Sequence, residues 1–511
     1  MKPKFYISTP IYYVNGAPHI GHAYTTIACD VMARFKRLDG FDVFFLTGTD
    51  EHGQKVEQAA AAAGVAPQTF ADDTTALFRG LTERLKISND DFIRTSEPRH
   101  KAACTELWRR VAAAGDIYLG GYEGWYAIRD EAFYDEAELT TRPDGTKIAP
   151  SGAQAEWVVE PSYFFRLSAW GDKLLKFYED HPDFILPASR RNEVISFVKS
   201  GLRDLSVSRT SFTWGVPVPD DPAHVMYVWF DALTNYLTAV GFPDTTQELW
   251  DFWPADVHMV GKDILRFHAI FWPAFLLSAG IAPPKRIYAH GWWTASGEKM
   301  SKSLGNVVDP EPLIEKYGLD SLRFFLFREV PFGNDGTFSE KALVSRLNVE
   351  LANDLGNLAQ RSLSLIARNC DGVLPGNDLA TADDEELLTS ANALIAGVRA
   401  RMERQAFGDA LEDIWKVIRA ANSYIDRQAP WALKKTDLTR MRCVLRVLAD
   451  VLRIVGTMLQ AFMPDKMAEM LDQLGVPADM RAIADLEAPL AEGIALPTPK
   501  GVFPRFVEEV E

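Results

Sequence analysis

Two histidines lie three residues apart in the stretch APHIGH, where His19 and His22 follow a turn and precede a helical pattern. Histidines at such a junction could cap the helix or pack in the core. They could instead bind a phosphate, because a helix N-terminus attracts anions and Gly21 lets the backbone approach a ligand closely. A metal is the third alternative, although no cysteine or carboxylate directly beside them completes a ligand set. The pair alone leaves these interpretations open.

Two lysines lie in a second stretch, EKMSKSLGN, which spans residues 298–306. Lys299 and Lys302 alternate with Ser301 and Ser303, and glycines bound the segment. Lysines on a flexible loop can swing onto a polyphosphate and neutralise the charge that develops during transfer. The simpler alternative is a solvated surface loop.

A third stretch, GKDI, follows a strand-like run and begins a helical pattern. Gly261 would allow a ligand to approach the backbone, and Asp263 could accept hydrogen bonds from ribose hydroxyls. An aspartate at a helix start can also serve only as a cap or a terminal charge. We favour ribose binding, because the transition from strand to helix is a ligand-binding edge of α/β sheets.

The elements that must position these residues follow from hydrophobic periodicity. Residues 4–9, KFYIST, predict a short buried strand, and apolar positions from Gly21 to about Leu38 recur at helical spacing. FDVFFLTG, residues 41–48, is a continuous apolar run typical of a strand covered on both faces. This order predicts a parallel βαβ unit, and hence a doubly wound, Rossmann-like α/β domain whose ligand edge carries the His19 loop.

The residue composition of the sequence changes after about Ala114. The next segment is rich in aromatic residues and turns, which predicts a small β-rich module inserted into the α/β domain. DVHMVG and RIYAHG resume the sheet, and leucines at helical spacing dominate beyond about Ser339. We expect the two halves of the α/β domain at 1–114 and 226–338, the inserted module at 115–225 and an α-helical bundle at 339–511.

The composition fits a globular protein, since 47% of the 511 residues are hydrophobic and 24% are charged. A net charge of −16 argues against a coat for nucleic acid, although a local basic groove is allowed. The four cysteines form no CxxC pair, which excludes a disulfide scaffold and a Cys-rich zinc ribbon. With no secretory signal and no membrane-length apolar run, we expect a cytoplasmic protein without membrane contact.

The two motifs together resemble the paired signatures of the class I aminoacyl-tRNA synthetases. PHIGH and KMSKS occur in the right order in a split α/β fold, 280 residues apart from His19 to Lys299. Other stretches, among them TPIYYVNGAPHIGH, LTGTDEHGQK, YVWFDALTNYL, VGKDILRFHAIFWPAFL and APWALKK, resemble the methionyl-tRNA synthetases along the whole chain. The resemblance implies a methionine-tRNA ligase, which activates methionine with ATP and transfers it to the terminal adenosine of tRNA.

The resemblance also assigns roles to the motif residues. The catalytic residues would stabilise charge on the phosphates and on the departing pyrophosphate, and are His19, His22, Lys299 and Lys302. ATP would be bound with Mg²⁺, and its protein contacts would be Gly21, Gly261, Asp263, Ile264, Ser301 and Lys302.

Methionine would occupy an apolar, aromatic pocket, with its α-ammonium group on Asp50. The pocket residues that the resemblance implies are Ile11, Tyr13, Trp229, Ala232, Leu233, Tyr236, Ile287 and His290. Taken singly, each aromatic residue could equally be a core residue. The spacing of seven between Trp229 and Tyr236 places both on one face of a predicted helix.

In the helical region the resemblance places Asn357, Arg361 and Trp431 at the anticodon of tRNA(Met). Asn357 and Arg361 are four apart and share a helix face, so an amide and a guanidinium could read base edges together. Trp431 could stack on an unpaired base. The alternatives are a hydrogen bond between helices and a core tryptophan.

The chain departs from the family pattern in the inserted module. Many relatives carry CxxC zinc knuckles there, whereas this insertion has no cysteine, and Ala127 and Asp130 stand at the corresponding positions. We therefore expect no structural zinc and no other metal site. Packing of aromatic side chains is expected to replace the stabilisation that a zinc ion would give, and these side chains are Tyr122, Trp125, Tyr126, Phe133 and Tyr134. No C-terminal domain of the oligonucleotide-binding type is expected, which favours a monomer.

Three other functions compete with this interpretation. A class I synthetase for leucine, isoleucine or valine would need an editing domain, and the roughly 110 residues of the insertion are too few for one. A nucleotidylyltransferase without an RNA partner would not explain the helical region. A non-catalytic tRNA-binding relative is disfavoured because both signature motifs are intact.

Overall fold

The computed structural model describes residues 2–507 apart from 296–297, 300–306 and 379. The chain forms two compact units, which we call the sheet unit and the helical unit. The sheet unit comprises Lys4–Pro18 and Phe44–His290, and the helical unit comprises Met1–Pro3, His19–Val43 and Gly291–Glu511. The division into four segments expected from the sequence stays a prediction.

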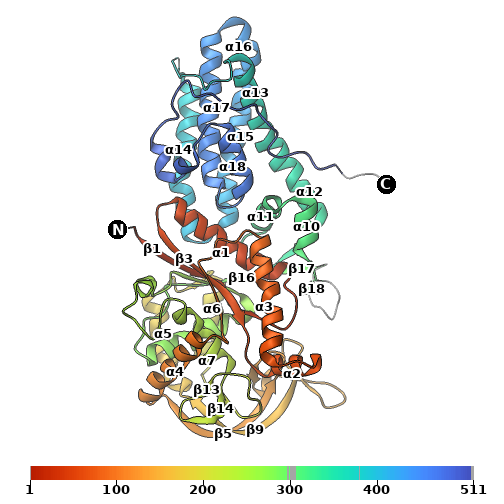
Figure 1. Ribbon diagram of the computed structural model, residues 1–511, viewed down its shortest axis with the longest axis vertical. Coiled ribbons are helices and arrows are strands. Elements are labelled where there is room, and N and C mark those ends of the chain that lie inside the picture. The colour runs from red at the N-terminus through yellow and green to blue at the C-terminus, as the bar shows by residue number, and fades with distance from the viewer. Residues whose placement is uncertain (1, 296–297, 300–306, 379, 508–511) are drawn as a thin grey trace. The chain divides into compact units, whose positions relative to one another are not determined.

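A seven-stranded sheet forms the centre of the sheet unit (Figure 1). Its strands, in spatial order, are β10 (Ile185–Leu186), β16 (Ile287–His290), β15 (Val257–Gly261), β1 (Lys4–Ser8), β3 (Asp42–Asp50) and β2 (Tyr12–Tyr13), with β4 (Asp91–Arg94) also paired to β3. β15 pairs in parallel with both β1 and β16, and β3 pairs in parallel with both β2 and β4. Strand β1 lies between β3 on one side and β15 on the other, and the strand order runs in opposite directions from it. Its carboxyl edge between β1 and β15 is therefore the switch point at which such sheets bind ligands.

Helices and an apolar core support this sheet. The helices of the sheet unit are α2 (Gln54–Ala63), α3 (Pro67–Arg84), α4 (Pro98–Ala113), α5 (Gly171–Asp180), α6 (Ala188–Lys199), α7 (Val228–Leu233), α8 (Asn235–Thr238) and α9 (Trp272–Ser278). One cluster of buried side chains joins strand residues such as Tyr6 and Leu46 to helix residues such as Leu107 and Trp272. Because strands β1 and β3 are buried along almost their whole length, they read as continuous apolar runs.

The inserted module is built on a long antiparallel pair, β5 (Ile117–Ala127) and β9 (Gln154–Phe165). Shorter strands extend it: β6 (Ala132–Tyr134), β7 (Thr140–Thr141), β8 (Lys147–Ile148) and β11 (Leu205–Ser206). A separate three-stranded sheet follows, made of β12 (Ser208–Arg209), β13 (Pro217–Val218) and β14 (Asp221–Met226). Tyr126 packs on Phe133 with ring centroids 4.8 Å apart, and Trp125 packs edge-on against Trp157 at 5.2 Å. Aromatic pairs thus pack this β-rich module.

The helical unit begins with α1 (Ile20–Leu38) and a small sheet of β17 (Trp293–Ala295), β18 (Glu298–Lys299) and β19 (Gly336–Phe338). Its further helices are α10 (Pro310–Tyr317), α11 (Leu319–Arg328), α12 (Glu340–Arg346), α13 (Asn357–Asn369), α14 (Ala382–Glu403), α15 (Phe407–Gln428), α16 (Pro430–Thr436), α17 (Leu438–Leu459) and α18 (Pro464–Gln473). The fold class predicted from the sequence is therefore confirmed.

No helix in the described part of the chain is long and apolar enough to cross a membrane.

Candidate functional site

His19 and His22 cap the N-terminus of α1. Nδ1 of His19 accepts the backbone N–H of Gly21 at 3.0 Å, and Nδ1 of His22 accepts the N–H of His19 at 3.1 Å. The two rings lie with centroids 3.9 Å apart. Since no Ser, Thr, Asp or Asn stands at this helix start, the imidazoles satisfy the exposed N–H groups reciprocally. The capping interpretation of the pair describes what the structure shows.

Capping also determines which nitrogen of each ring carries a proton. A nitrogen that accepts an N–H bears none itself, so in neutral His19 and His22 the proton is on Nε2. An Nε2–H group at the positive end of a helix is a suitable donor to a phosphate oxygen, so capping and phosphate binding are compatible. A Cβ at Gly21 would lie 2.9 Å from Cε1 of His19, so a larger residue there would displace the capping imidazole. Contact of Gly21 with ATP stays a prediction.

The segments on both sides of the KMSKS stretch contact α1. The N–H of Ile20 donates to the carbonyl oxygen of Val308 at 3.1 Å, shortly after the stretch ends. Trp293, in the strand that leads into the stretch, packs edge-on against Tyr24 of α1 at 5.9 Å. The helical unit therefore brings the flanks of the second motif to the helix that the first motif caps.

The lysines of that stretch are described only in part. β17 pairs antiparallel with β18, and the backbone of Lys299 lies opposite Thr294. Ser301 and Lys302 lie outside the described residues. β17 and β18 thus form an antiparallel pair, and the roles of Lys299, Ser301 and Lys302 stay predictions.

Gly261, Asp263 and His290 lie together at the carboxyl edge of the sheet. Gly261 ends β15, and its register partner in β16 is His290. A Cβ at Gly261 would lie 2.6 Å from Oδ1 of Asp263, so the exposed carboxylate of Asp263 folds back over the strand end. An edge of this kind can accept a ribose, and ribose binding by Gly261 and Asp263 stays a prediction. His290, predicted for methionine, lies beside Gly261 on the edge predicted for ATP, and its role stays a prediction.

Trp229 and Tyr236 lie on two short consecutive helices, α7 and α8, rather than on the single helix that their spacing predicts. The ring of Trp229 stacks on Phe267 with centroids 3.8 Å apart and planes 6° apart. The ring of Tyr236 stacks on His258 at 3.9 Å. These are flat aromatic surfaces of the kind that grips a thioether side chain.

His268 is the residue that the sequence reasoning missed. Its Nδ1 lies 2.9 Å from the carbonyl oxygen of Ile264 and its Nε2 lies 2.8 Å from the hydroxyl of Tyr236. A carbonyl can only accept, so Nδ1 carries the proton and Nε2 accepts from Tyr236. Burial lowers the pKa of His268 to about 4, which keeps the ring neutral. The wall around Tyr236 is therefore polar but uncharged.

A local departure from α-helical geometry positions this histidine. Residues Phe267–Phe271 form a π-helical turn between a single 3₁₀ turn, Lys262–Ile264, and α9. Such turns widen a helix by one residue and are frequent at functional sites. The sequence predicted only one continuous apolar helix here, and a histidine within it signals the exception.

Asp50 is a buried carboxylate at the end of β3, aligned with Tyr13 in the parallel pairing of β2 and β3. Its Oδ1 has no hydrogen-bond partner among the described atoms. Burial, followed by the charges of Asp231 and Glu131, raises the pKa of Asp50 well above its usual range. An ammonium group beside Asp50 would relieve both the missing bond and the unfavourable charge.

The other residues predicted for methionine are placed unequally. Ala232 and Leu233 are buried in α7 between Trp229 and Tyr236, and Ile11 packs partly buried against the same apolar core. Ile287 begins β16 and is fully buried at the end of the strand opposite His290. Ile264, predicted for ATP, instead provides the carbonyl that orients His268. The roles of all five residues stay predictions.

The three residues predicted for the anticodon gather at one place in the helical unit. Asn357 begins α13 with an exposed side chain, and Arg361 follows one turn later. The guanidinium of Arg361 lies 5.3 Å from the ring centroid of Trp431, and its Nη2 lies 2.6 Å from Oδ1 of Asp426. Trp431 is 44% exposed, which excludes a core tryptophan. An exposed indole beside a guanidinium suits an unpaired base.

Among the described residues, one group of potential metal ligands is His100, Cys104 and Asp231. Asp231 lies between two imidazoles, with 2.6 Å from Oδ1 to Nε2 of His100 and 2.6 Å from Oδ2 to Nδ1 of His52. Two ligand atoms around a tetrahedral zinc lie about 3.3 Å apart, so these are hydrogen-bond distances. Burial alone would raise the pKa of Asp231, but the two imidazoles hold it well below its usual range.

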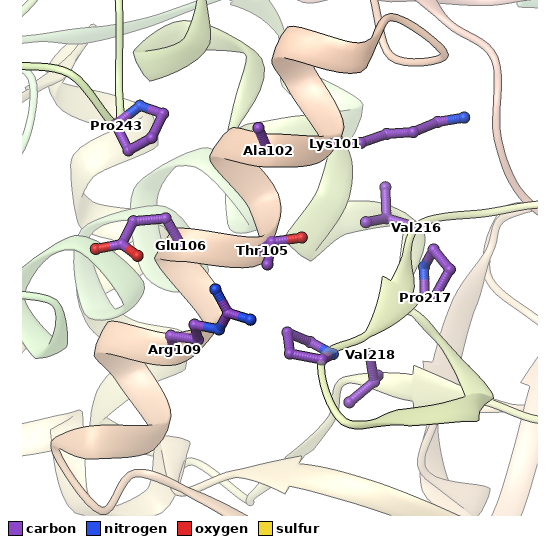
Figure 2. Close-up of a pocket in the computed structure, with 10 residues that line it drawn as sticks. Lys101, Ala102, Thr105, Glu106, Arg109, Val216, Pro217, Val218 and Pro243 are labelled. Atoms are coloured by element: carbon purple, nitrogen blue, oxygen red, sulfur yellow. The ribbon is translucent and has the colours of Figure 1, made fainter.

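A hollow on the outer face of α4 lies apart from these residues. Figure 2 shows Lys101, Thr105 and Arg109 facing Val216 and Pro217 across it. None of the predicted site residues lines this hollow. It therefore has no part in the candidate site.

Two family models match the chain. The model for "tRNA synthetases class I (M)" matches residues 5–363, and the model for "Anticodon binding domain of methionyl tRNA ligase" matches residues 374–511. Among curated relatives, the methionine–tRNA ligase of Brucella suis biovar 1 is 58% identical over 511 residues, covering 100% of this chain and 99% of the relative. That of Mycobacterium tuberculosis is 55% identical over 512 residues, covering 99% and 98%.

Solved structures agree with these matches. Mycobacterium tuberculosis methionyl-tRNA synthetase in complex with methionyl-adenylate superposes with a TM-score of 0.97 at 54% identity, over 99% of this chain and 100% of that one. The ligand-free form of the enzyme from the same organism gives a TM-score of 0.91 at 50% identity, over 99% of both chains.

Proposed function

The chain belongs to the class I tRNA synthetases of the methionine type and is a methionine–tRNA ligase, and within that reaction we propose a role for each part of the site. The carboxylate of methionine attacks the α-phosphorus of ATP and pyrophosphate leaves. A ribose hydroxyl of the terminal adenosine of tRNA then attacks the methionyl-adenylate, and AMP leaves. The observation that carries this function is the match to curated methionine–tRNA ligases over the full length of the chain.

His19 and His22 stabilise the phosphate oxygens of ATP during the first step. Their cap geometry supports this role, because it leaves the proton on Nε2 of each ring next to a helix N-terminus. Lys299 and Lys302 neutralise the departing pyrophosphate, and Mg²⁺ accompanies the nucleotide. Asp263 accepts the ribose hydroxyls at the carboxyl end of β15.

Methionine binds between Asp50 and the aromatic wall. The missing hydrogen bond at Oδ1 of Asp50 supports a contact with the α-ammonium group. The side chain lies against Trp229 and Tyr236, and the neutral Tyr236–His268 pair meets the sulfur without placing a charge beside it. A charged wall would favour polar amino acids of similar length instead.

The anticodon of tRNA(Met) binds at Asn357, Arg361 and Trp431. The exposure of Trp431 and the adjacent guanidinium support stacking on a base. We further propose that the enzyme works as a monomer in the cytoplasm. The four cysteines are buried and none of them forms a disulfide, which suits a reducing compartment.

ATP–pyrophosphate exchange, measured with each amino acid in turn, tests the function. Methionine is expected to support exchange far better than leucine, isoleucine or valine, and faster exchange with any other amino acid would refute the specificity. Light scattering tests whether the enzyme is a monomer, because it measures the molecular mass in solution.

A pair of variants separates the two roles of His22. His22→Ala removes both the capping acceptor and the Nε2 donor, whereas His22→Asn keeps an acceptor at the position of Nδ1 for the N–H of His19 and loses the donor at Nε2. Both are expected to lower the rate of exchange by about 100-fold or more, while only His22→Ala lowers the melting temperature. Exchange at the wild-type rate in either variant would exclude the catalytic role.

A further inference from the structure

One residue of the inserted module reaches the methionine side of the sheet unit. Glu131 stands in the turn between β5 and β6, and its side chain is buried. Oε1 of Glu131 accepts the hydroxyl of Tyr13 at 3.0 Å and the backbone N–H of Lys55 at 3.3 Å. Oε2 accepts the hydroxyl of Tyr126 from β5. One carboxylate thus joins the module to the strand that carries Tyr13.

The backbone of Glu131 contacts a second wall of the same site. Its carbonyl oxygen accepts the hydroxyl of Tyr227 at 2.8 Å. Tyr227 immediately precedes α7, which carries Trp229, Ala232 and Leu233. The turn is therefore bonded to both the Tyr13 side and the Trp229 side of the predicted pocket.

The fit around this contact is tight. Glu131 adopts a φ of 50°, in the left-handed region that a residue with a side chain occupies only at an energetic cost. A Cβ at Gly53 would lie 2.6 Å from the hydroxyl of Tyr13 and 3.0 Å from Oε1 of Glu131, so only glycine fits there. Hydroxyl, carboxylate and the Gly53 backbone are in direct contact, which leaves the Tyr13 ring little freedom.

The Tyr13 hydroxyl has one proton and two acceptors. The carbonyl oxygen of His52 lies at 2.9 Å and Oε1 of Glu131 at 3.0 Å. Bonds to a charged acceptor are stronger than bonds to a neutral one, so Glu131 restrains the hydroxyl more firmly than the carbonyl does. When the charge of Glu131 is removed, the hydroxyl of Tyr13 has only neutral acceptors, such as the carbonyl oxygen of His52. Because these bonds are weaker, the ring of Tyr13 is freer to move.

We propose that Glu131 is a positioning residue through which the inserted module fixes Tyr13 and so determines the affinity of the site for methionine. This inference rests on the proposed function, because it assumes that Tyr13 borders bound methionine. It gives the module a direct part in recognition of the amino acid, made by the turn between β5 and β6.

Exchange kinetics of Glu131→Gln test the proposal. The variant keeps the shape of the side chain and loses its charge, and the KM for methionine is expected to rise about tenfold while the KM for ATP stays within about twofold. Asp130→Asn is the matched control. Its carboxylate, one residue earlier in the same turn, accepts the hydroxyl of Tyr134 within the module at 2.9 Å. An equal rise in Asp130→Asn would show a general effect of the module and overturn the proposal.

A double-mutant cycle with Tyr13→Phe provides the decisive measurement. If Glu131 acts through the Tyr13 hydroxyl, Glu131→Gln has no further effect on the KM for methionine in the Tyr13→Phe background. The proposal would be overturned if the KM for methionine of the double variant rose by the product of the two single-variant increases. An unchanged KM for methionine in Glu131→Gln would also overturn it. If Glu131→Gln does not fold, Glu131→Asp replaces it in both experiments, because it keeps the charge but shortens its reach to the Tyr13 hydroxyl; the same rise in the KM for methionine is expected, and an unchanged KM would overturn the proposal. Absence of methionine-dependent exchange in the wild-type enzyme would instead refute the proposed function.

Discussion

The hydroxyl of Tyr236 donates a hydrogen bond to Nε2 of His268 at 2.8 Å, in a wall that is polar but uncharged. Nδ1 of the same ring is committed to the carbonyl oxygen of Ile264, so the direction of the bond is determined by the local backbone. The residue that orients the tyrosine is therefore itself oriented by a π-helical turn. A site for an uncharged thioether gains from this arrangement, because it is polar without being ionic.

Tyr236→Phe is expected to weaken methionine binding. It leaves Nε2 of His268 as a buried acceptor without a donor, at a cost of about 1–3 kcal/mol shared between stability and binding. The KM for methionine should rise roughly tenfold in the exchange assay, with a much smaller change in the KM for ATP. The phenyl ring can keep its stack on His258, so the fold should persist. Equal changes in both KM values would contradict a specific role in methionine binding.

The pKa of His268 predicts how stability depends on pH. Burial lowers it to about 4, below the unfolded value of about 6.5, so the folded protein binds fewer protons between these values. The stabilisation is present above pH 6.5 and is lost as the pH falls toward 4. Between pH 7 and pH 5 this amounts to about 2 kcal/mol. Thermal melts of wild type and His268→Gln at both pH values check it: the variant should lose less stability on acidification.

Much of the fold followed from periodicity, because strands buried on both faces and amphipathic helices leave strong patterns. KFYIST and FDVFFLTG became β1 and β3, and the stripe from Gly21 to Leu38 became α1. The break between α7 and α8 and the π-helical turn at Phe267 left no such pattern. Both depend on packing around the site, which overrides local preference.

The candidate site was predicted less completely for a related reason. Motif spacing identified His19 and His22 but left capping and phosphate binding as rivals, since only hydrogen-bond geometry shows that Nδ1 serves the cap. His268 stands inside an apolar run, where a histidine is more often a core residue. Glu131 is 118 residues from Tyr13, and a contact of that range has no periodicity to reveal it.

A buried ion pair stabilises the helical unit. Arg323 of α11 and Asp30 of α1 are both fully buried with 2.7 Å between Nη2 and Oδ2, and Arg323 also donates to the carbonyl oxygen of Phe462. Asp30→Asn removes the carboxylate that is in direct contact with the buried guanidinium and is expected to cost about 3–5 kcal/mol. Thermal unfolding measures it. Asp426→Asn, which breaks the exposed pair with Arg361, is the control and should cost less than about 1 kcal/mol. Equal costs would contradict the role of burial.

Asp320 gives a pH dependence opposite in sign to that of His268. Burial raises the pKa of Asp320 to about 6, above an unfolded value of about 3.9, so the folded state holds the extra proton between these values. The resulting stabilisation is complete below pH 3.9 and is lost as the pH rises through 6. Relative to wild type, Asp320→Asn should therefore gain about 1 kcal/mol on going from pH 5 to pH 8. Parallel stability curves for the two proteins over this range would refute the assignment.

Trp431→Ala is expected to impair charging of tRNA without affecting activation of methionine. The indole is 44% exposed and can stack on an unpaired base, and the guanidinium of Arg361 lies over its ring. Removal of the ring is expected to weaken the binding of that base by about 1–3 kcal/mol. The KM for tRNA(Met) should rise roughly 5- to 150-fold, whereas ATP–pyrophosphate exchange keeps its rate. Leu438→Ala, at another exposed apolar residue of the helical unit, controls for general surface effects. A loss of exchange in Trp431→Ala would mean that the indole supports the fold rather than the RNA, and an unchanged KM for tRNA would remove it from the anticodon site.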